Sequence, residues 1–399
     1  MKDQFVVPAR LKTTSYVLLG IGLLTLLIGL FAFSGEHGST RFWAGLLQNS
    51  TFFLMMSLAC TFFIAATTLA HGGWQIGFRR VPEAISMTVP VLGVILLVLL
   101  GFLIFGGKGH VYHWLHPEGD RILEMKAPFL NPAFTSIASV ITIGAWIALT
   151  IKLRRMSLNE DTWTMTPEKG KSLLWRNTVW CAAFIVIYAL SIGSTTPWIW
   201  LMSIDAHWFS TMYSWYTFAS TWVSGLSLIA LFVIYLKGQG YLPWVNDEHM
   251  HDLGKFMFAF SIFWAYLWFS QYMLIWYANM PEETVYFQPR VWGPWRPVFF
   301  LNLILNFVCP LLIFMKRATK RNYTIVTFTA ILIIFGHWLD FYQMVMPGTV
   351  GGLYFPWFEL GIGLGFVGLV ILITANQLAK APMVPKNHPY LKESIVHHV

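Results

Sequence analysis

Long apolar runs alternate with short polar connections along the whole chain. A helix that crosses a bilayer needs about 20 predominantly apolar residues, and ten runs meet that requirement. They predict transmembrane helices near residues 15–33, 48–70, 84–106, 132–152, 175–195, 208–236, 253–280, 297–315, 323–346 and 357–379. Pro and Gly mark most connections, whereas Pro90 and Pro310 fall within predicted spans and Pro197 falls at the edge of one. Because the connections are short, residues 1–399 are expected to form a single polytopic membrane domain.

The composition supports an all-α integral membrane protein. Only 11% of the 399 residues are charged and 56% are hydrophobic, whereas soluble domains carry about a quarter charged residues. The chain also has 20 Trp, 33 Phe and 15 Tyr, residues that collect where hydrocarbon meets headgroups. So few charges cannot cover a surface facing water, so we expect most of the chain to face lipid.

The positive charges are distributed unevenly between the two sides of the predicted bundle. With the N-terminus inside, 20 of the 26 Lys and Arg residues lie in inner segments and six in outer ones. This positive-inside bias predicts cytoplasmic N- and C-termini. The net charge of +8 does not indicate nucleic-acid binding, because the basic residues form short tracts beside apolar runs.

No redox centre or metal site is expected in this chain. Cys60, Cys181 and Cys309 each lie within an apolar run, and none belongs to a C-x-x-C pair. They are expected to be small buried hydrophobes. His71 and His337 lie at opposite predicted depths, so they could not form the two axial ligands of a haem b.

Ionisable residues in or near the spans fall into two groups by predicted depth. An ionisable group in hydrocarbon is costly and usually faces a cavity or a partner. The outer group consists of Asp205, His207, His337, Asp340 and Glu359, and the inner group consists of His71, Glu83, Asp252 and Lys255. Together they are candidates for two proton half-channels.

Each of these residues also has a structural interpretation. His337 and Asp340, three residues apart on one helix, could handle protons near neutral pH or lock two helices together. Asp205 stands where an N-cap of the sixth span would stand, although with His207 it could also deprotonate a quinol. Glu359 would complement the dipole of the tenth helix.

The seventh span carries an unusual stripe of polar side chains. Lys255, Tyr266, Ser270 and Tyr277 fall within roughly 60° of one another on a helix. They could line a water chain, or the tyrosines could anchor the helix while Lys255 reaches the headgroups. His71 precedes two glycines at a helix end, where an imidazolium is favoured. His397 and His398 end a polar tail and are expected to be solvated.

Three segments resemble a known family of membrane proteins. They are the run from Asp252 through Glu283, the tail MVPKNHPYLKES (Met383–Ser394) and the HGGW turn (His71–Trp74). In these segments, and in its ten spans with short loops, the chain resembles the ActF membrane subunits of bacterial alternative complex III, which are NrfD-like proteins. The resemblance implies two four-helix bundles plus two peripheral helices.

It also implies a quinol:cytochrome c (or oxidase) oxidoreductase in the bacterial cytoplasmic membrane. The expected partners are a sister NrfD-like subunit, an iron–sulfur subunit, haem c subunits and membrane lipids, with menaquinol as a candidate ligand. Haem c and iron–sulfur clusters would then belong to those partners, and this chain would be redox-inactive, with no catalytic residue. It would scaffold the complex and could conduct protons. The alternatives are a stand-alone secondary transporter and a pure scaffold with no proton role.

Overall fold

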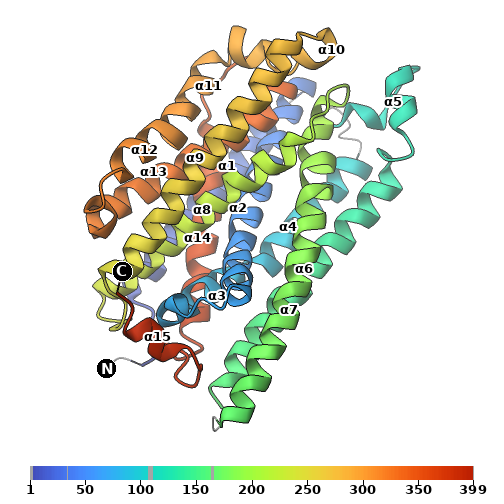
Figure 1. Cartoon of the computed structure of the whole chain (residues 1–399). Helices are drawn as coiled ribbons and strands as arrows, with labels where there is room; N and C mark the ends of the chain where they lie inside the picture. Colours follow the sequence, from blue (N-terminus) through green and yellow to red (C-terminus); the bar gives the residue numbers. More distant parts are fainter. Residues whose placement is uncertain (1–2, 34, 107–110, 163–165, 399) are drawn as a thin grey trace.

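The computed structural model describes residues 3–33, 35–106, 111–162 and 166–398. In these ranges the chain is helical and contains no β-strand (Figure 1). Ten helices within the described residues are long and apolar enough to cross a membrane, and each overlaps one predicted span. The predicted all-helical, multi-pass architecture is confirmed at this level.

The first five spans occupy the first half of the chain. Its α-helices are α1 (Ala9–Ala32), α2 (Glu36–Leu69), α3 (Arg80–Ser86), α4 (Val89–Phe105), α5 (Arg121–Lys126), α6 (Pro132–Glu160) and α7 (Pro167–Gly193). Short 3₁₀ or π turns cover Trp74–Phe78, His113–Leu115, Thr195–Leu201 and Met202–Asp205. α3 and α4 together make the third span, and Pro90 stands in the first turn of α4. Pro90 therefore lies within a span, as predicted, and it fits at this position because its missing N–H would have no helical partner.

The last five spans follow in the second half. Its α-helices are α8 (Met212–Gly238), α9 (Asp247–Ala278), α10 (Pro281–Thr284), α11 (Arg296–Leu303), α12 (Cys309–Phe314), α13 (Tyr323–Val345), α14 (Trp357–Leu378) and α15 (Leu391–Ile395). Short 3₁₀ or π turns cover Gln288–Trp292, Ile304–Val308, Thr319–Arg321 and Met346–Gly348. Pro310 also lies within its span, as predicted. It cannot donate to the carbonyl of Asn306, and the π turn Ile304–Val308 lies directly before α12.

The long helices pack in two neighbouring groups. α2 packs on α4 and α7, and α6 packs on α4 and α7. In the other group α8 packs on α9 and α13, α12 packs on α9 and α13, and α11 packs on α13. α2 also contacts α8 and joins the groups. Figure 1 shows α6 and α7 on one side of the molecule and α9 and α12 on the other.

Small residues join the first span to the last. α1 packs mainly on α14 through Ser15, Gly22, Thr25 and Gly29, which are its buried residues. A Cβ atom added to Gly22 would lie 2.4 Å from the Cα of Gly365. Such close backbone approach is how small residues hold helices together in lipid.

The two chain ends meet at one end of the bundle, here called the terminal end. The backbone N–H of Met383 donates to the carbonyl of Asp3 at 2.9 Å, and Lys386 Nζ lies 2.7 Å from Asp3 Oδ2. α5 and α10 lie at the opposite end, here called the loop end (Figure 1). The clusters of polar residues described below are placed with respect to these two ends.

Candidate functional site

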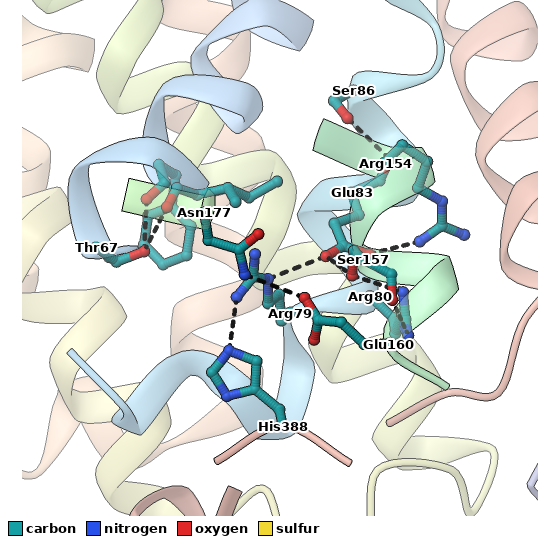
Figure 2. A network of polar contacts seen from close by, with 12 residues as sticks. Thr67, Arg79, Arg80, Glu83, Ser86, Arg154, Ser157, Glu160, Asn177 and His388 are labelled. Atoms are coloured by element: carbon teal, nitrogen blue, oxygen red, sulfur yellow. Dashed lines mark hydrogen bonds and ion pairs between the residues drawn. The ribbon is translucent and has the colours of Figure 1, made fainter. Parts of the chain in front are cut away.

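Glu83 is the centre of a buried ionic network at the terminal end (Figure 2). Its carboxylate accepts hydrogen bonds from Arg79 at 3.0 Å, Arg80 at 2.9 Å and Arg154 at 2.6 Å. Ser157 Oγ donates to it at 2.5 Å. Glu83 is 2% exposed. Three guanidinium groups around one carboxylate hold a fixed negative charge, an arrangement suited to joining helices.

Two further carboxylates balance the charges of this network. Asp161 accepts from Arg80 at 2.6 Å, and buried Glu160 accepts from Asn177 on α7 at 3.1 Å. Burial raises the pKa of Asp161, and the nearby Arg80 partly offsets that effect. The network therefore ties α3, α6 and α7 together. Sequence analysis identified Glu83 but not its arginine partners.

The C-terminal tail closes the same network from the terminal end. Arg79 donates to Nε2 of His388 at 3.1 Å, and the backbone N–H of Tyr390 faces the other ring nitrogen at 3.2 Å. Burial and the neighbouring Arg79 lower the pKa of His388 to about 3. A protonated ring would have no nitrogen able to accept from Arg79, so the neutral imidazole, which keeps one acceptor nitrogen, is the form that fits.

The tail then docks on the turn after α2. Glu393 accepts from the backbone N–H of Gly73 at 3.0 Å. Ser394 Oγ accepts from Gly77 N–H at 2.9 Å and donates to the carbonyl of Trp74 at 2.6 Å. His71, by contrast, is exposed and adopts a positive φ of 52°. The tail therefore contacts the glycine turn but not the His71 imidazole.

Asp252 meets the end of the tail on α9. His397 Nε2 lies 2.8 Å from one carboxylate oxygen of Asp252, and Lys255 Nζ lies 2.5 Å from the other. The expectation that His397 is solvated is wrong, because the tail folds back over the bundle and its side chain is only 16% exposed. His398 is exposed as expected.

Asp340 and His337 are fully buried on α13 and bond to neighbouring helices. The hydroxyl of Tyr216 on α8 and the indole N–H of Trp264 on α9, at 3.0 Å, both donate to Asp340. His337 Nδ1 lies 3.1 Å from Ser220 Oγ but 3.9 Å from Asp340. The pair shares a face as predicted, yet each member bonds to another helix rather than to the other member.

Unpartnered polar atoms lie on both sides of Asp340, those of Gln271, Gln343 and Asn302 toward the loop end and those of His337 and Asn306 toward the terminal end. A cavity of about 20 Å³ adjoins Tyr216, Gln271 and Gln343, and a cavity of this size holds about one water molecule. Several buried polar atoms here have no hydrogen-bond partner among the described residues: Nε2 of Gln271, Gln343 and His337, Oδ1 of Asn302, and both side-chain heteroatoms of Asn306. We call the following set of residues the polar column: Asp205 and Arg290, then Gln271 and Gln343, and finally Asp340 and His337.

Asp205 and Arg290 form the loop end of the polar column. Arg290 NH2 lies 3.2 Å from Asp205 Oδ2, and its guanidinium stacks 3.5 Å from the ring centre of Tyr286. Burial raises the pKa of Tyr286 to about 12. The structural interpretation of Asp205 as N-cap is wrong: α8 begins only at Met212, and Asp205 ends a 3₁₀ turn.

The other predicted outer residues lie in separate pairs. Glu359 is fully buried and accepts from Arg41 at 2.9 and 3.0 Å, a two-pronged ion pair between α14 and α2. His207 bonds Asp120 at 2.5 Å on the surface, 52% exposed, and this bond lowers the pKa of Asp120. Neither pair belongs to the polar column.

The predicted stripe on α9 lies on the outside of the chain. Tyr266 is 63% exposed and Tyr277 is 84% exposed, while Lys255 is exposed and Ser270 half-buried. A different stripe, on α8, faces the interior: Ser220, Ser224 and Ser227 are all fully buried. Their spacing of four and three residues in the sequence is the signal that could have found it.

Among the described residues no three His, Cys, Asp or Glu side chains gather as a metal site would require. Of the cysteines, Cys60 and Cys181 are buried and Cys309 is half-buried. A scan against protein-family models and a search of curated proteins both found no match.

Proposed function

We propose that this chain is a membrane subunit of a quinol-oxidising respiratory complex, of the ActF family, in the bacterial cytoplasmic membrane. In this proposal the terminal end faces the cytoplasm, in keeping with the positive-inside bias. The subunit scaffolds the complex, and electrons pass through iron–sulfur clusters and haem c in its partners. It also conducts protons between the loop end and the middle of the membrane.

The polar column is the observation that carries the proton role. Buried ionisable and amide groups in a membrane bundle are costly, and they usually mark ion or proton pathways. The column begins at Asp205 and Arg290 at the loop end, passes a water-sized cavity and reaches Asp340 and His337. Because Gln271, Gln343 and His337 keep polar atoms without protein partners, they are suited to contact water.

The α8 serines offer a continuation toward the terminal end. Ser220 contacts His337, and Ser224 and Ser227 follow on the same face. Their hydroxyls donate to backbone carbonyls of α8 at 2.8 and 2.9 Å, which leaves their oxygens able to accept. The inner half of the pathway is therefore proposed on α8, not on the exposed stripe of α9.

Two features support the family assignment. The HGGW turn and the tail, on which the resemblance rests, bond to each other through Gly73 and Glu393. The helices also pack as two groups, with α1 and α14 beside them. Exposed aromatic residues such as Trp215, Trp276 and Phe105 offer contact surface for lipids and partner subunits.

Purification of the tagged subunit from its native membrane tests the proposal. We expect haem c absorption bands and iron–sulfur and sister NrfD-like subunits in fixed ratio, identified by mass spectrometry. Quinol oxidation in proteoliposomes should then acidify one side. A colourless, homogeneous single protein would overturn the assignment and favour a stand-alone transporter. A coloured complex without proton movement would leave a scaffold alone.

A further inference from the structure

A long apolar groove opens between the α1–α14 pair and the rest of the bundle. Its volume is about 610 Å³. The lining side chains come from α1, α2, α8, α13 and α14 and include Leu11, Phe52, Leu231, Tyr235, Trp338 and Val367. It is separate from the polar column, since none of the residues of that column lines it.

The groove runs along more than half of the length of the α1–α14 pair. Along α14 its lining begins at Leu360, in the first turn on the loop-end side, and runs to Ile371, a rise of about 16 Å. On α1 and α8 it extends to Leu11 and Tyr235, close to the terminal end. A chain lying in it would therefore enter from the leaflet on the side of the two termini.

The walls of the groove suit a hydrocarbon chain rather than a polar ring. Its lining is aliphatic and aromatic apart from Gly363 and the rim residue Tyr235. The indole N–H of Trp338 is already used, because it donates to Asn49 at 2.8 Å. The oxygens of a quinone head need hydrogen-bond donors, and among the described residues no free donor remains beside Trp338 in the groove.

Positive charge flanks the mouth of the groove. Arg10 and Lys12 stand on either side of Leu11 in the first turn of α1, and both are exposed. Arg10, Thr13 and Thr14 line a second, shallow hollow of about 520 Å³. Cations and hydroxyls at this depth complement a lipid phosphate and its glycerol esters.

We propose that the groove binds an acyl chain of an anionic phospholipid from the leaflet at the terminal end, with its phosphate held by Arg10 and Lys12. The lipid fills the space between the α1–α14 pair and the bundle. Binding combines burial of the chain in an apolar groove with attraction at its mouth. This inference holds for the chain whichever complex it joins.

Native mass spectrometry of the full chain, released from detergent with added lipid, tests the proposal. The probes are dioleoyl phosphatidylglycerol and dioleoyl phosphatidylcholine. We expect a single saturable phosphatidylglycerol adduct, with phosphatidylcholine bound about tenfold more weakly.

Leu231→Trp, which fills the groove, should weaken the phosphatidylglycerol adduct about tenfold or more. Leu190→Trp is the matched control, because Leu190 lies on α7 and is 69% exposed outside the groove.

The headgroup is tested separately. The double variant Arg10→Gln, Lys12→Gln should bind phosphatidylglycerol no better than phosphatidylcholine. Equal phosphatidylglycerol binding by wild type and Leu231→Trp, with both proteins monodisperse, would overturn the proposal. Displacement of phosphatidylglycerol by menaquinone-4, one for one and at lower concentration, would overturn it too and assign the groove to a quinone tail.

Discussion

The hydroxyl of Tyr216 on α8 donates to the carboxylate of Asp340 on α13, and both side chains are buried. This bond joins two helices in the middle of the bundle and places an ionisable group at the inner end of the polar column. Whether Asp340 serves only to hold the helices together or also relays protons is open to direct test.

Replacing Asp340 by Asn keeps the shape of the side chain but removes its ability to take up a proton. We expect proton translocation coupled to quinol oxidation in proteoliposomes to fall about tenfold or more. Tyr216→Phe is the control: it keeps the carboxylate and should cost about 1 kcal/mol of stability with most translocation retained. Unchanged translocation in Asp340→Asn would show that Asp340 is structural only.

Glu83→Gln should destabilise the protein more than any exposed carboxylate change. It leaves Arg79, Arg80 and Arg154 buried without their shared carboxylate, and breaking a buried pair costs about 3–5 kcal/mol. Thermal unfolding in detergent measures the loss. Glu168→Gln, the same change at an exposed position, should shift stability by about 0.5 kcal/mol or less. Similar melting of the two variants would contradict the role assigned to the network.

His388 should make stability depend on pH. Its pKa falls from 6.5 to about 3 on folding, so between these values the unfolded chain binds a proton that the folded chain does not. Stability contributed by the neutral ring is therefore present above pH 6.5 and is lost as pH falls, by about 1.4 kcal/mol per pH unit.

The measurement is the melting temperature at pH 8 and at pH 5. His388→Gln keeps an acceptor for Arg79 without a group that titrates in this range, so its melting temperature should fall less between the two pH values. His398→Gln, at the exposed end of the tail, should behave like wild type. An identical pH response in all three proteins would exclude His388 as the cause.

Gly22→Leu should separate α1 from α14. The added side chain meets the backbone of Gly365, and overpacking costs about 1–3 kcal/mol. Hydrogen exchange of α1 in detergent should rise. Gly20→Leu is the matched control, since a Cβ at Gly20 meets nothing within 4 Å. Equal exchange in both variants would argue against the small-residue contact.

Tyr266→Phe and Tyr277→Phe should leave proton translocation unchanged. Both hydroxyls lie on the exposed face of α9, which points away from the polar column. The same proteoliposome assay checks this. A strong loss in either variant would restore the α9 stripe as a pathway and would require a partner subunit to cover it.

The spans were predictable because the cost of exposing backbone polar groups to lipid acts on each apolar run by itself. Where the ends differ, the helix continues past its apolar run, as in the fifth span, which covers Pro167–Asp205. The partners of the candidate residues were not predictable in the same way. Arg41 and Glu359, or Glu83 and Arg154, are far apart in sequence and meet only because particular helices pack together.

Sequence periodicity was ambiguous for a related reason. In a transmembrane helix, a stripe of polar side chains can face the interior of the bundle or the lipid headgroups. The spacing of the polar residues on α9 is the same in both cases. The buried serines of α8 and the exposed tyrosines of α9 differ in their neighbours, not in their spacing. His397 was assigned to solvent because nothing in a short polar tail indicates that it folds back onto Asp252.

The α1–α14 contact has a consequence for biosynthesis. Of the ten described spans, the one synthesised first packs chiefly against the one synthesised tenth. Until α14 enters the bilayer, the glycine face of α1 has only lipid to contact, so this contact forms only after the eight spans between the two helices have been made. A nascent chain stopped after α13 would keep its two helix groups but carry an unpaired first helix, a form that membrane quality control could recognise.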